Sequence, residues 1–332
     1  MSARAEESQL AARRALLAGL ESEYPFESQL LDLDGVALHY LDEGPRDGEP
    51  LLFVHGNPTW SFLWRNLVRA LRGRYRCIAP DHIGCGLSDK PEAYPYRLAR
   101  HIENLEQLAL HLDLERITLV VHDWGGPIGL GFAARHPERI ARLVILNTAA
   151  FPGPAPLRIR ICRTPLLGAL AVRGFNAFAG LATRMAVERP LTPLARRGYL
   201  APYHDWASRI ATLRFVEDIP LDPNHPSWRA LQDVEAGLAR LADKPACLIW
   251  GERDWCFTPA FREGFERRLP GARVHRAQNA GHLVVEDARD DVLAWLEAFL
   301  AESPLDSPEV RERTRASAEL RPANEGSHAR PR

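Results

Sequence analysis

One acidic residue lies where the chain is predicted to turn most sharply. The β-branched run 117–122 ends at Asp123, and Gly125 and Gly126 follow at once. This strand–turn–helix pattern is typical of a nucleophile elbow, which raises one side chain above the end of a sheet. Serine or cysteine there would indicate acyl transfer, whereas a carboxylate indicates attack on an electrophilic carbon to form a covalent ester. A helix cap is the structural alternative for Asp123.

Two downstream residues complete the order nucleophile, acid, histidine, which is typical of hydrolases with such an elbow. Asp254 lies in a loop after the apolar run 246–250, and His282 lies in a turn after a strand-like run. Asp254 would hold the imidazole in one tautomer and stabilise its charged form. The competing residues are Glu252 and Asp287 for the acid, and His122, His136 and His275 for the histidine.

A loop at 55–60 follows the apolar run 51–54 and supplies hydrogen-bond donors. Gly56 permits a close backbone approach. The backbone N–H groups of Asn57 and Trp124 are predicted to form an oxyanion hole, in which one donor is worth about 3 kcal/mol. The Asn57 amide and the Trp124 indole are uncharged donors, which would stabilise a leaving anion without neutralising the carboxylate. Taken singly, each would be read as a turn or packing residue.

These residues need a sheet to position them, and strand-like runs do alternate with helical stretches. The predicted strands lie near 36–41, 51–55, 76–80, 117–122, 143–148, 246–250 and 273–276. The predicted helices lie near 60–72, 100–113, 126–136, 260–268 and 289–300. The alternation predicts an α/β fold with a mostly parallel, doubly wound sheet. It stops between about 152 and 228, a helical stretch that we expect to be an inserted cap over the carboxyl edge of the sheet.

Four regions follow from this pattern. Residues 25–151 and 229–300 form the core, and 152–228 form the cap. Residues 1–24 carry a short one-sided leucine stripe and are predicted to be a helical extension. The tail 301–332 is rich in Pro, Glu, Arg and Ser and is predicted to be disordered.

Composition excludes several classes of function. The 332 residues carry a formal net charge of -1, which argues against a general nucleic-acid or anionic-membrane surface. No segment has the length of a signal peptide or a membrane span. The five cysteines form no C-x-x-C pair and no metal-ligand spacing, so we expect a cytoplasmic protein without metal or organic cofactor.

The motifs resemble those of the haloalkane dehalogenase family, within the α/β-hydrolase fold, from about residue 30 to 300. The most specific segments are 55–58, 81–91 and 122–126. The resemblance implies that Asp123 displaces halide, that His282 activates water to hydrolyse the ester, and that Asn57 and Trp124 hold the halide. Some members have a glutamate after the sixth strand. Here 146–150 contain no acid, so Asp254 would serve, as in the third subfamily.

The cap resembles more closely the β-lactone decarboxylases of bacterial long-chain olefin biosynthesis, which are carbon–carbon lyases. The segments that carry this likeness are 143–152, 172–178, 201–203 and 214–221. The resemblance implies that a long-chain cis-3,4-dialkyl β-lactone loses carbon dioxide to give a cis-alkene. It also implies work beside a thiolase, a reductase and a β-lactone synthetase, with which the chain would assemble.

Two routes remain open for such a lactone. Asp123 would attack either the ring carbon that bears oxygen, expelling a carboxylate, or the carbonyl, making an anhydride that fragments. Neither route consumes water, so the task of His282 is less evident than in a dehalogenase.

Three other functions compete with the decarboxylase. A haloalkane dehalogenase would have the same core residues and differ in the cap. An epoxide hydrolase, the weaker alternative, would need two cap tyrosines, for which Tyr199 and Tyr203 are available. A binding or assembly module is disfavoured because all five key groups are present.

Overall fold

One sheet organises the part of the chain that the computed structural model describes, residues 10–154, 156–164 and 166–305. Its strand order is β1-β2-β4-β3-β5-β6-β7-β8. The second strand pairs antiparallel with β1 and β4, and the remaining pairs are parallel, which confirms the predicted mostly parallel sheet. The strands are β1 (Gln29–Leu33), β2 (Val36–Glu43), β3 (Pro50–Val54), β4 (Arg76–Pro80), β5 (Ile117–Asp123), β6 (Ile140–Thr148), β7 (Ala246–Gly251) and β8 (Arg273–Ala277).

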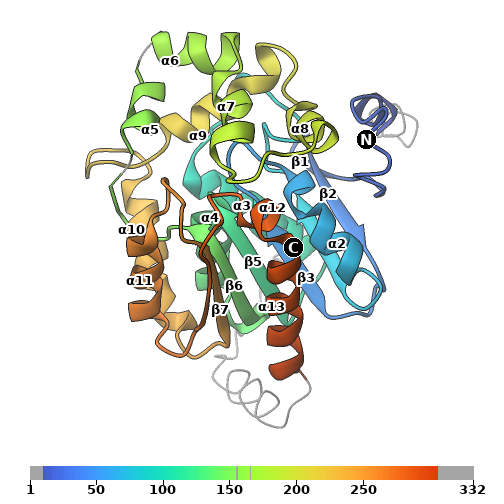
Figure 1. Cartoon of the computed structure of the whole chain (residues 1–332), viewed down its shortest axis with the longest axis vertical. Coiled ribbons are helices and arrows are strands. Elements are labelled where there is room, and N and C mark those ends of the chain that lie inside the picture. Colours follow the sequence, from blue (N-terminus) through green and yellow to red (C-terminus); the bar gives the residue numbers. More distant parts are fainter. Residues whose placement is uncertain (1–9, 155, 165, 306–332) are drawn as a thin grey trace, which may run out of the picture.

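Helices cover both faces of the sheet (Figure 1). One face is covered by α2, α12 and α13, and the other by α3, α4, α10 and α11. The α-helices are α2 (Arg65–Leu71), α3 (Leu98–His111), α4 (Gly125–Arg135), α5 (Leu157–Cys162), α6 (Leu167–Ala169), α7 (Ala177–Met185), α8 (Pro193–Leu200), α9 (Ile210–Glu217), α10 (Trp228–Gly237), α11 (Pro259–Arg268), α12 (Val284–Asp287) and α13 (Arg289–Glu302). Shorter turns are η1 (Ser61–Trp64), η2 (Pro137–Arg139), the π-helical η3 (Leu170–Gly174), η4 (Ala207–Arg209) and η5 (Leu238–Leu241).

The continuous apolar strands have this composition because they are buried on both sides. In β3, Leu51 and Phe53 join the core beneath α2 and α13, while Leu52 and Val54 join the core beneath α3 and α4. Successive side chains of a strand point to opposite faces, so both sets must be apolar.

The prediction missed the edge strand β1. It forms a hairpin with β2 through Asp34 and Gly35, which have φ values of 54° and 88°. Positive φ at both central residues is characteristic of a two-residue hairpin, and Asp-Gly is its strongest sequence signal. The signal was present, but β1 is only partly buried and lacks a long apolar run.

The described residues between β6 and β7 form helices and loops with no strand. In Figure 1 these helices, α5 to α9, lie above one edge of the sheet. We propose that residues 152–228 form the cap that the sequence predicts, because they cover the carboxyl end of β5.

The terminal regions are described in part. Residues 10–15 are helical, and Leu20 is buried against the body. At the other end, α13 continues to Glu302 and Leu305 is buried, so ordered chain extends slightly past the predicted boundary at residue 300. The remainder of the predicted tail, 306–332, and residues 1–9 lie outside the described residues.

Candidate active site

The turn after β5 places Asp123 at the end of the sheet. Asp123 has a φ of 52°, in the left-handed region that L-residues rarely adopt, and α4 begins two residues later at Gly125. A side chain at Gly125 would overlap the backbone of Val54 in β3. Strain of this kind at a non-glycine residue persists only where the surrounding structure imposes it, and it is concentrated at functional sites.

Val121 stands two residues before Asp123, where serine hydrolases usually have glycine. A side chain at Gly129 of α4 would approach Val121 Cγ1 to 2.7 Å. Gly129 therefore leaves room for the Val121 side chain where α4 packs on β5.

Two backbone amides hold the Asp123 carboxylate. The N–H of Asn57 donates to Asp123 Oδ1 over 2.6 Å, and the N–H of Trp124 also hydrogen-bonds the carboxylate. A side chain at Gly56 would overlap that carboxylate, which explains the glycine in this loop. These are the donors that the sequence predicts as an oxyanion hole. In the structure they are bound to the carboxylate itself, because an aspartate carries a second oxygen that a serine lacks.

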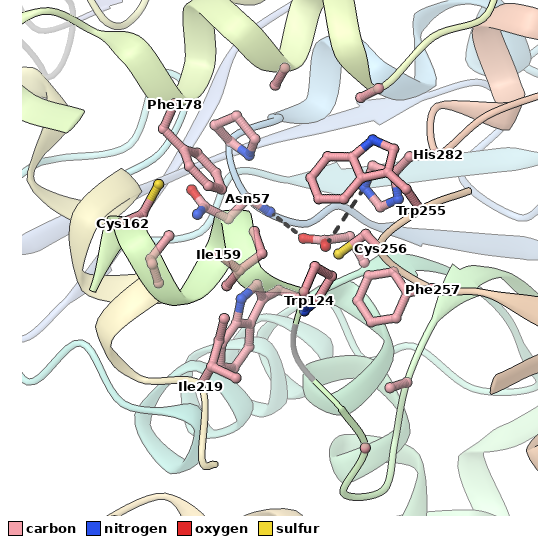
Figure 2. Close-up of a pocket in the computed structure, with 18 of the residues that line it drawn as sticks. Asn57, Trp124, Ile159, Cys162, Phe178, Ile219, Trp255, Cys256, Phe257 and His282 are labelled. Carbon is pink, nitrogen blue, oxygen red and sulfur yellow. Dashed lines mark hydrogen bonds and ion pairs between the residues drawn. The ribbon is translucent and has the colours of Figure 1, made fainter. Parts of the chain in front are cut away.

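His282 lies between two carboxylates. Its Nδ1 is 2.9 Å from Asp254 Oδ2, and its Nε2 is 3.7 Å from Asp123 Oδ2. In Figure 2 the dashed lines that run from Asn57 and from His282 mark the contacts of these two residues with the Asp123 carboxylate. The structure thus brings together the three residues predicted as a triad.

The competing residues have other partners. Glu252 contacts Arg262, and Asp287 accepts hydrogen bonds from backbone amides. His136 contacts Glu106, and His275 stacks on Trp295 at 4.9 Å. His122 lies beside the site and supports it, since its Nε2 is 2.9 Å from the backbone oxygen of His282.

The two carboxylates have opposite pKa shifts. Burial raises the pKa of Asp123, although His282 and the two backbone amides oppose this. Burial also acts to raise the pKa of Asp254, but the charge and hydrogen bond of His282 outweigh it and lower that pKa overall. For His282, burial acts to lower the pKa, and Asp254 together with Asp123 raises it overall. The arrangement favours an imidazolium flanked by carboxylates.

The side chains of Asn57 and Trp124 face the cavity beside Asp123. The Asn57 amide donates to the backbone oxygen of Thr212 in α9 over 3.1 Å, and its Oδ1 is buried without a hydrogen-bond partner. The Trp124 ring packs on Phe215, also in α9, with centroids 5.2 Å apart. Both predicted donors are therefore positioned by the same cap helix.

A cavity of about 560 Å³ extends from Asp123 into the cap. Asp123 and His282 are the only charged or titratable side chains other than cysteine among the described residues that line it. The rest of the lining is largely apolar, and part of it comes from α5, η3 and α7; Ile159, Phe178 and Ile219 are visible in Figure 2. The cavity therefore places the Asp123 carboxylate at one end of a space that suits an apolar ligand.

Tyr199 and Tyr203, the tyrosines considered for an epoxide, do not line this cavity. The Tyr199 hydroxyl donates to Glu286 and the Tyr203 hydroxyl to the backbone oxygen of Thr59. They are engaged elsewhere, which removes the observation that favoured an epoxide hydrolase. In the described residues no group of three or more His, Cys, Asp and Glu side chains is arranged to hold a metal ion.

The sequence prediction overlooked Asn147 at the end of β6. Its Nδ2 donates to Asp254 Oδ2 over 3.0 Å and to the backbone oxygen of Gly251, and its Oδ1 accepts from the N–H of Gly251. The side chain is fully buried and the residue has a φ of 25°. Asn147 therefore fixes the loop that carries Asp254. A buried polar residue at the end of an apolar strand was the available signal.

Comparison with known proteins gives consistent results. Residues 49–288 match the model of the α/β hydrolase fold family. A cis-3-alkyl-4-alkyloxetan-2-one decarboxylase of Shewanella oneidensis is 48% identical over 292 residues, which cover 86% of this chain and 91% of that protein. The protein of the same name from Xanthomonas campestris pv. campestris is 46% identical over 295 residues, 85% of this chain and 98% of the relative.

Among solved structures, the haloalkane dehalogenase DatA from Agrobacterium tumefaciens superposes with a TM-score of 0.77 at 26% sequence identity, covering 84% of this chain and 97% of that one. The predicted resemblance is thereby confirmed, both for the fold and for the group. The chain belongs to the α/β-hydrolase family, in the haloalkane dehalogenase-like group that includes the cis-3-alkyl-4-alkyloxetan-2-one decarboxylases.

Proposed function

We propose that this protein removes carbon dioxide from cis-3,4-dialkyl β-lactones and releases cis-alkenes. The observation that carries the proposal is the level of similarity: two relatives named for this decarboxylation are 48% and 46% identical to this chain over 85–86% of its length. The cap is where a decarboxylase and a dehalogenase with one triad would differ. The large apolar cavity above Asp123 supports the same conclusion, because the substrate carries two alkyl chains.

The first step in this proposal is displacement at the ring carbon that bears oxygen. Asp123 Oδ2 forms a bond to that carbon while the carbon–oxygen bond of the ring breaks, and the electron pair leaves on a carboxylate. The side chains of Asn57 and Trp124 donate to this carboxylate. In the second step the carbon–carbon bond to the carboxylate breaks, and its electrons form the double bond of the alkene. The carbon–oxygen bond of the ester to Asp123 breaks at the same time. Carbon dioxide leaves, and the Asp123 carboxylate is restored without any proton transfer.

Attack on the ring carbon fits the site better than attack on the carbonyl, both in its hydrogen bonds and in its stereochemistry. Carbonyl attack creates an oxyanion that needs preorganised donors, and the backbone amides of Asn57 and Trp124 already bond to Asp123. The stereochemistry also agrees. Displacement inverts the ring carbon, and an anti elimination then restores the cis relationship of the two alkyl groups.

His282 acts as a charged group in this scheme. Its raised pKa favours the imidazolium, which lies 3.7 Å from the nucleophile and would stabilise the carboxylates as charge moves between them. Asp254 keeps it oriented through Nδ1. The water-activating task that a histidine has in ester hydrolysis is not required, since no ester is hydrolysed.

The deciding experiment incubates the purified protein separately with a long-chain cis-β-lactone and with 1-bromohexane. Alkene is measured by mass spectrometry and bromide by ion chromatography. Alkene with little bromide, lost in Asp123→Ala, supports the decarboxylase. Bromide without alkene would make the protein a haloalkane dehalogenase, the second candidate, which is favoured by the dehalogenase structure with a TM-score of 0.77.

We further propose that the enzyme works in the cytoplasm, assembled with the β-lactone synthetase and reductase that would supply its substrate. All five cysteines are free, as expected in a reducing compartment. The described helices include none that is long and apolar enough to span a bilayer. Deletion of residues 1–24 tests whether this extension binds those enzymes. Unchanged co-purification of the synthetase and the reductase with the truncated protein would show that the extension is not the contact.

A further inference from the structure

Large apolar side chains are exposed almost entirely on the cap. Among the described residues only one exposed large apolar side chain, Leu110 of α3, lies elsewhere. The exposed cap side chains, hereafter the cap face, are Leu157, Ile161, Leu166, Leu167, Leu170, Phe175, Leu181, Met185 and Trp206. Single exposed apolar residues are ordinary on a protein surface, but a group of this size marks a binding surface.

The cap face is built by regular spacing. Leu157 and Ile161 lie one turn apart on α5, and Leu181 and Met185 lie one turn apart on α7, so each pair is on one side of its helix. The elements that carry these residues also contact one another, since α6 and α7 both pack against η3 and α5 packs against α6. In Figure 1 these three helices lie together at the end of the molecule away from the sheet.

The cavity opens on the cap face. Ile161, Leu181 and Met185 line the cavity that contains Asp123, and all three are also exposed. A ligand that enters the active site between α5 and α7 therefore passes through the apolar surface.

The segment that carries most of the cap face is more positively charged than the chain as a whole. Residues 140–187 contain no Asp or Glu and include five arginines after residue 152. Arg160 and Arg184 are exposed, whereas Arg173 pairs with Glu92. The net charge of -1 for the whole chain, which argued against an anionic surface as a partner, conceals this local excess of positive charge.

We propose that the cap face docks on an anionic phospholipid bilayer, with the cavity mouth against the lipid. Aliphatic side chains beside arginines are features of interfacial helices that lie on such bilayers. Eight of the nine residues of the cap face lie in the segment 157–185, which contains no Asp or Glu, and the ninth, Trp206, adjoins the exposed Asp205. Protein interfaces instead favour aromatic anchors, and leucine is under-represented among their strongest contacts. Six of the nine residues of the cap face are Leu or Ile.

The benefit for catalysis rests on the proposed function. An alkene without a polar group partitions from water into lipid by roughly a factor of four for each methylene. A product with two long alkyl chains would leave the cavity slowly into water. A mouth held against a bilayer lets it leave into lipid, and lets an alkylated lactone enter by the same path.

The test measures co-sedimentation of the full-length protein with phosphatidylcholine vesicles that contain or lack phosphatidylglycerol. Leu170→Gln and Leu110→Gln form a matched pair, since these leucines are 50% and 45% exposed and neither lines the cavity. We expect binding to the anionic vesicles that weakens with salt. It should fall on the order of tenfold in Leu170→Gln, and further in Leu167→Gln/Leu170→Gln, but remain unchanged in Leu110→Gln.

Absence of vesicle binding, or equal binding by all variants, would overturn the proposal. A wild-type dimer that becomes monomeric in Leu167→Gln/Leu170→Gln, without vesicle binding, would assign the face to a second copy of the chain instead. Vesicle binding does not require turnover. Binding without alkene formation would therefore reject the proposed reaction and leave the docking surface standing. Alkene formation without vesicle binding would reject the docking surface and leave the proposed reaction standing.

Discussion

The backbone N–H of Asn57 lies 2.6 Å from Oδ1 of Asp123, so a donor that would serve an oxyanion in a serine hydrolase is bound here to the carboxylate that we propose as the nucleophile. The second oxygen, Oδ2, faces His282 and the cavity. One carboxylate oxygen is thus anchored and the other is available for attack. This division suits displacement at a saturated carbon, in which no new oxyanion forms on the attacked carbon.

Asp123→Asn and Asp254→Asn are expected to change stability in opposite directions. Burial raises the pKa of Asp123, so its carboxylate destabilises the native state at neutral pH, and the neutral amide should raise Tm. The pKa of Asp254 is lowered by His282, so its carboxylate is stabilising and its loss should lower Tm. In a chain of 332 residues about 1 kcal/mol shifts Tm by roughly 1.5 °C. Calorimetry of both variants at pH 7 checks this, and equal shifts would contradict the assigned charges.

The pH dependence of unfolding follows from the same shifts. The stabilising contribution of Asp254 is present above its unfolded pKa and disappears as pH falls through its lower folded pKa. The contribution of His282 is complete below 6.5 and disappears as pH rises through its higher folded pKa. We expect denaturant titrations to show greatest stability on the acid side of neutrality. In His282→Gln, stability should no longer fall in the pH range just above 6.5.

His282→Gln should separate the two candidate reactions. Hydrolysis of an alkyl ester needs a general base, whose loss costs about 10²- to 10⁴-fold, whereas the proposed decarboxylation transfers no proton. With 1-bromohexane the variant should accumulate an ester on Asp123, visible as a mass increase of one hexyl group. With the β-lactone it should still turn over, at a reduced rate. His136→Gln, which changes a histidine bonded to Glu106 away from the cavity, is the control. Ester accumulation with both substrates, without alkene from the lactone, would contradict the prediction that the lactone still turns over in this variant.

Asn147→Ala should impair the site through Asp254. The substitution removes hydrogen bonds to Asp254 and Gly251 inside the core, which should lower the free energy of unfolding by about 1–3 kcal/mol. Without that anchor His282 loses its orientation, so we expect kcat to fall more than KM changes. Asn147→Asp adds a carboxylate against Asp254 and should move the acid limb of the pH profile to higher pH. Asn279→Ala, an exposed change near the His282 turn, should alter neither property.

Local sequence was sufficient to predict the elements that create the site. The run 117–122 with Gly125 and Gly126 predicted the strand, turn and helix that the structure has at β5, Asp123 and α4. Such elements are predictable because a buried strand and a sharp turn are encoded by neighbouring residues, whereas the catalytic roles of Asp123, Asp254 and His282 stay predictions. The antiparallel edge strand β1 was missed because its partial burial left no apolar run, although Asp34 and Gly35 marked the hairpin.

Contacts between distant segments could not be predicted. The Asn57 amide meets Thr212, 155 residues away, and Asn147 meets Asp254 across the ends of two strands. An asparagine in a sequence does not show which of its hydrogen-bond donors will have partners in the folded chain. The oxyanion hole was therefore expected to be open, and the structure has its amides bound to Asp123. Which side of each cap helix is buried depends on contacts with distant segments, which the local spacing of residues does not show.

Asp287, the rejected candidate for the acid, is expected to matter for another reason. Its carboxylate accepts from the backbone N–H of Gly281, next to His282, and from those of Glu188 and Arg189 after α7. It therefore joins the histidine turn to the cap. Asp287→Asn replaces one acceptor oxygen by a donor and leaves a buried amide unpaired, at about 1–3 kcal/mol. We expect a lower Tm and a lower kcat together. Asp290→Asn, three residues along and 88% exposed, should stay within about 0.5 kcal/mol of wild type. A stable Asp287→Asn with full activity would show that the cap and His282 are positioned independently.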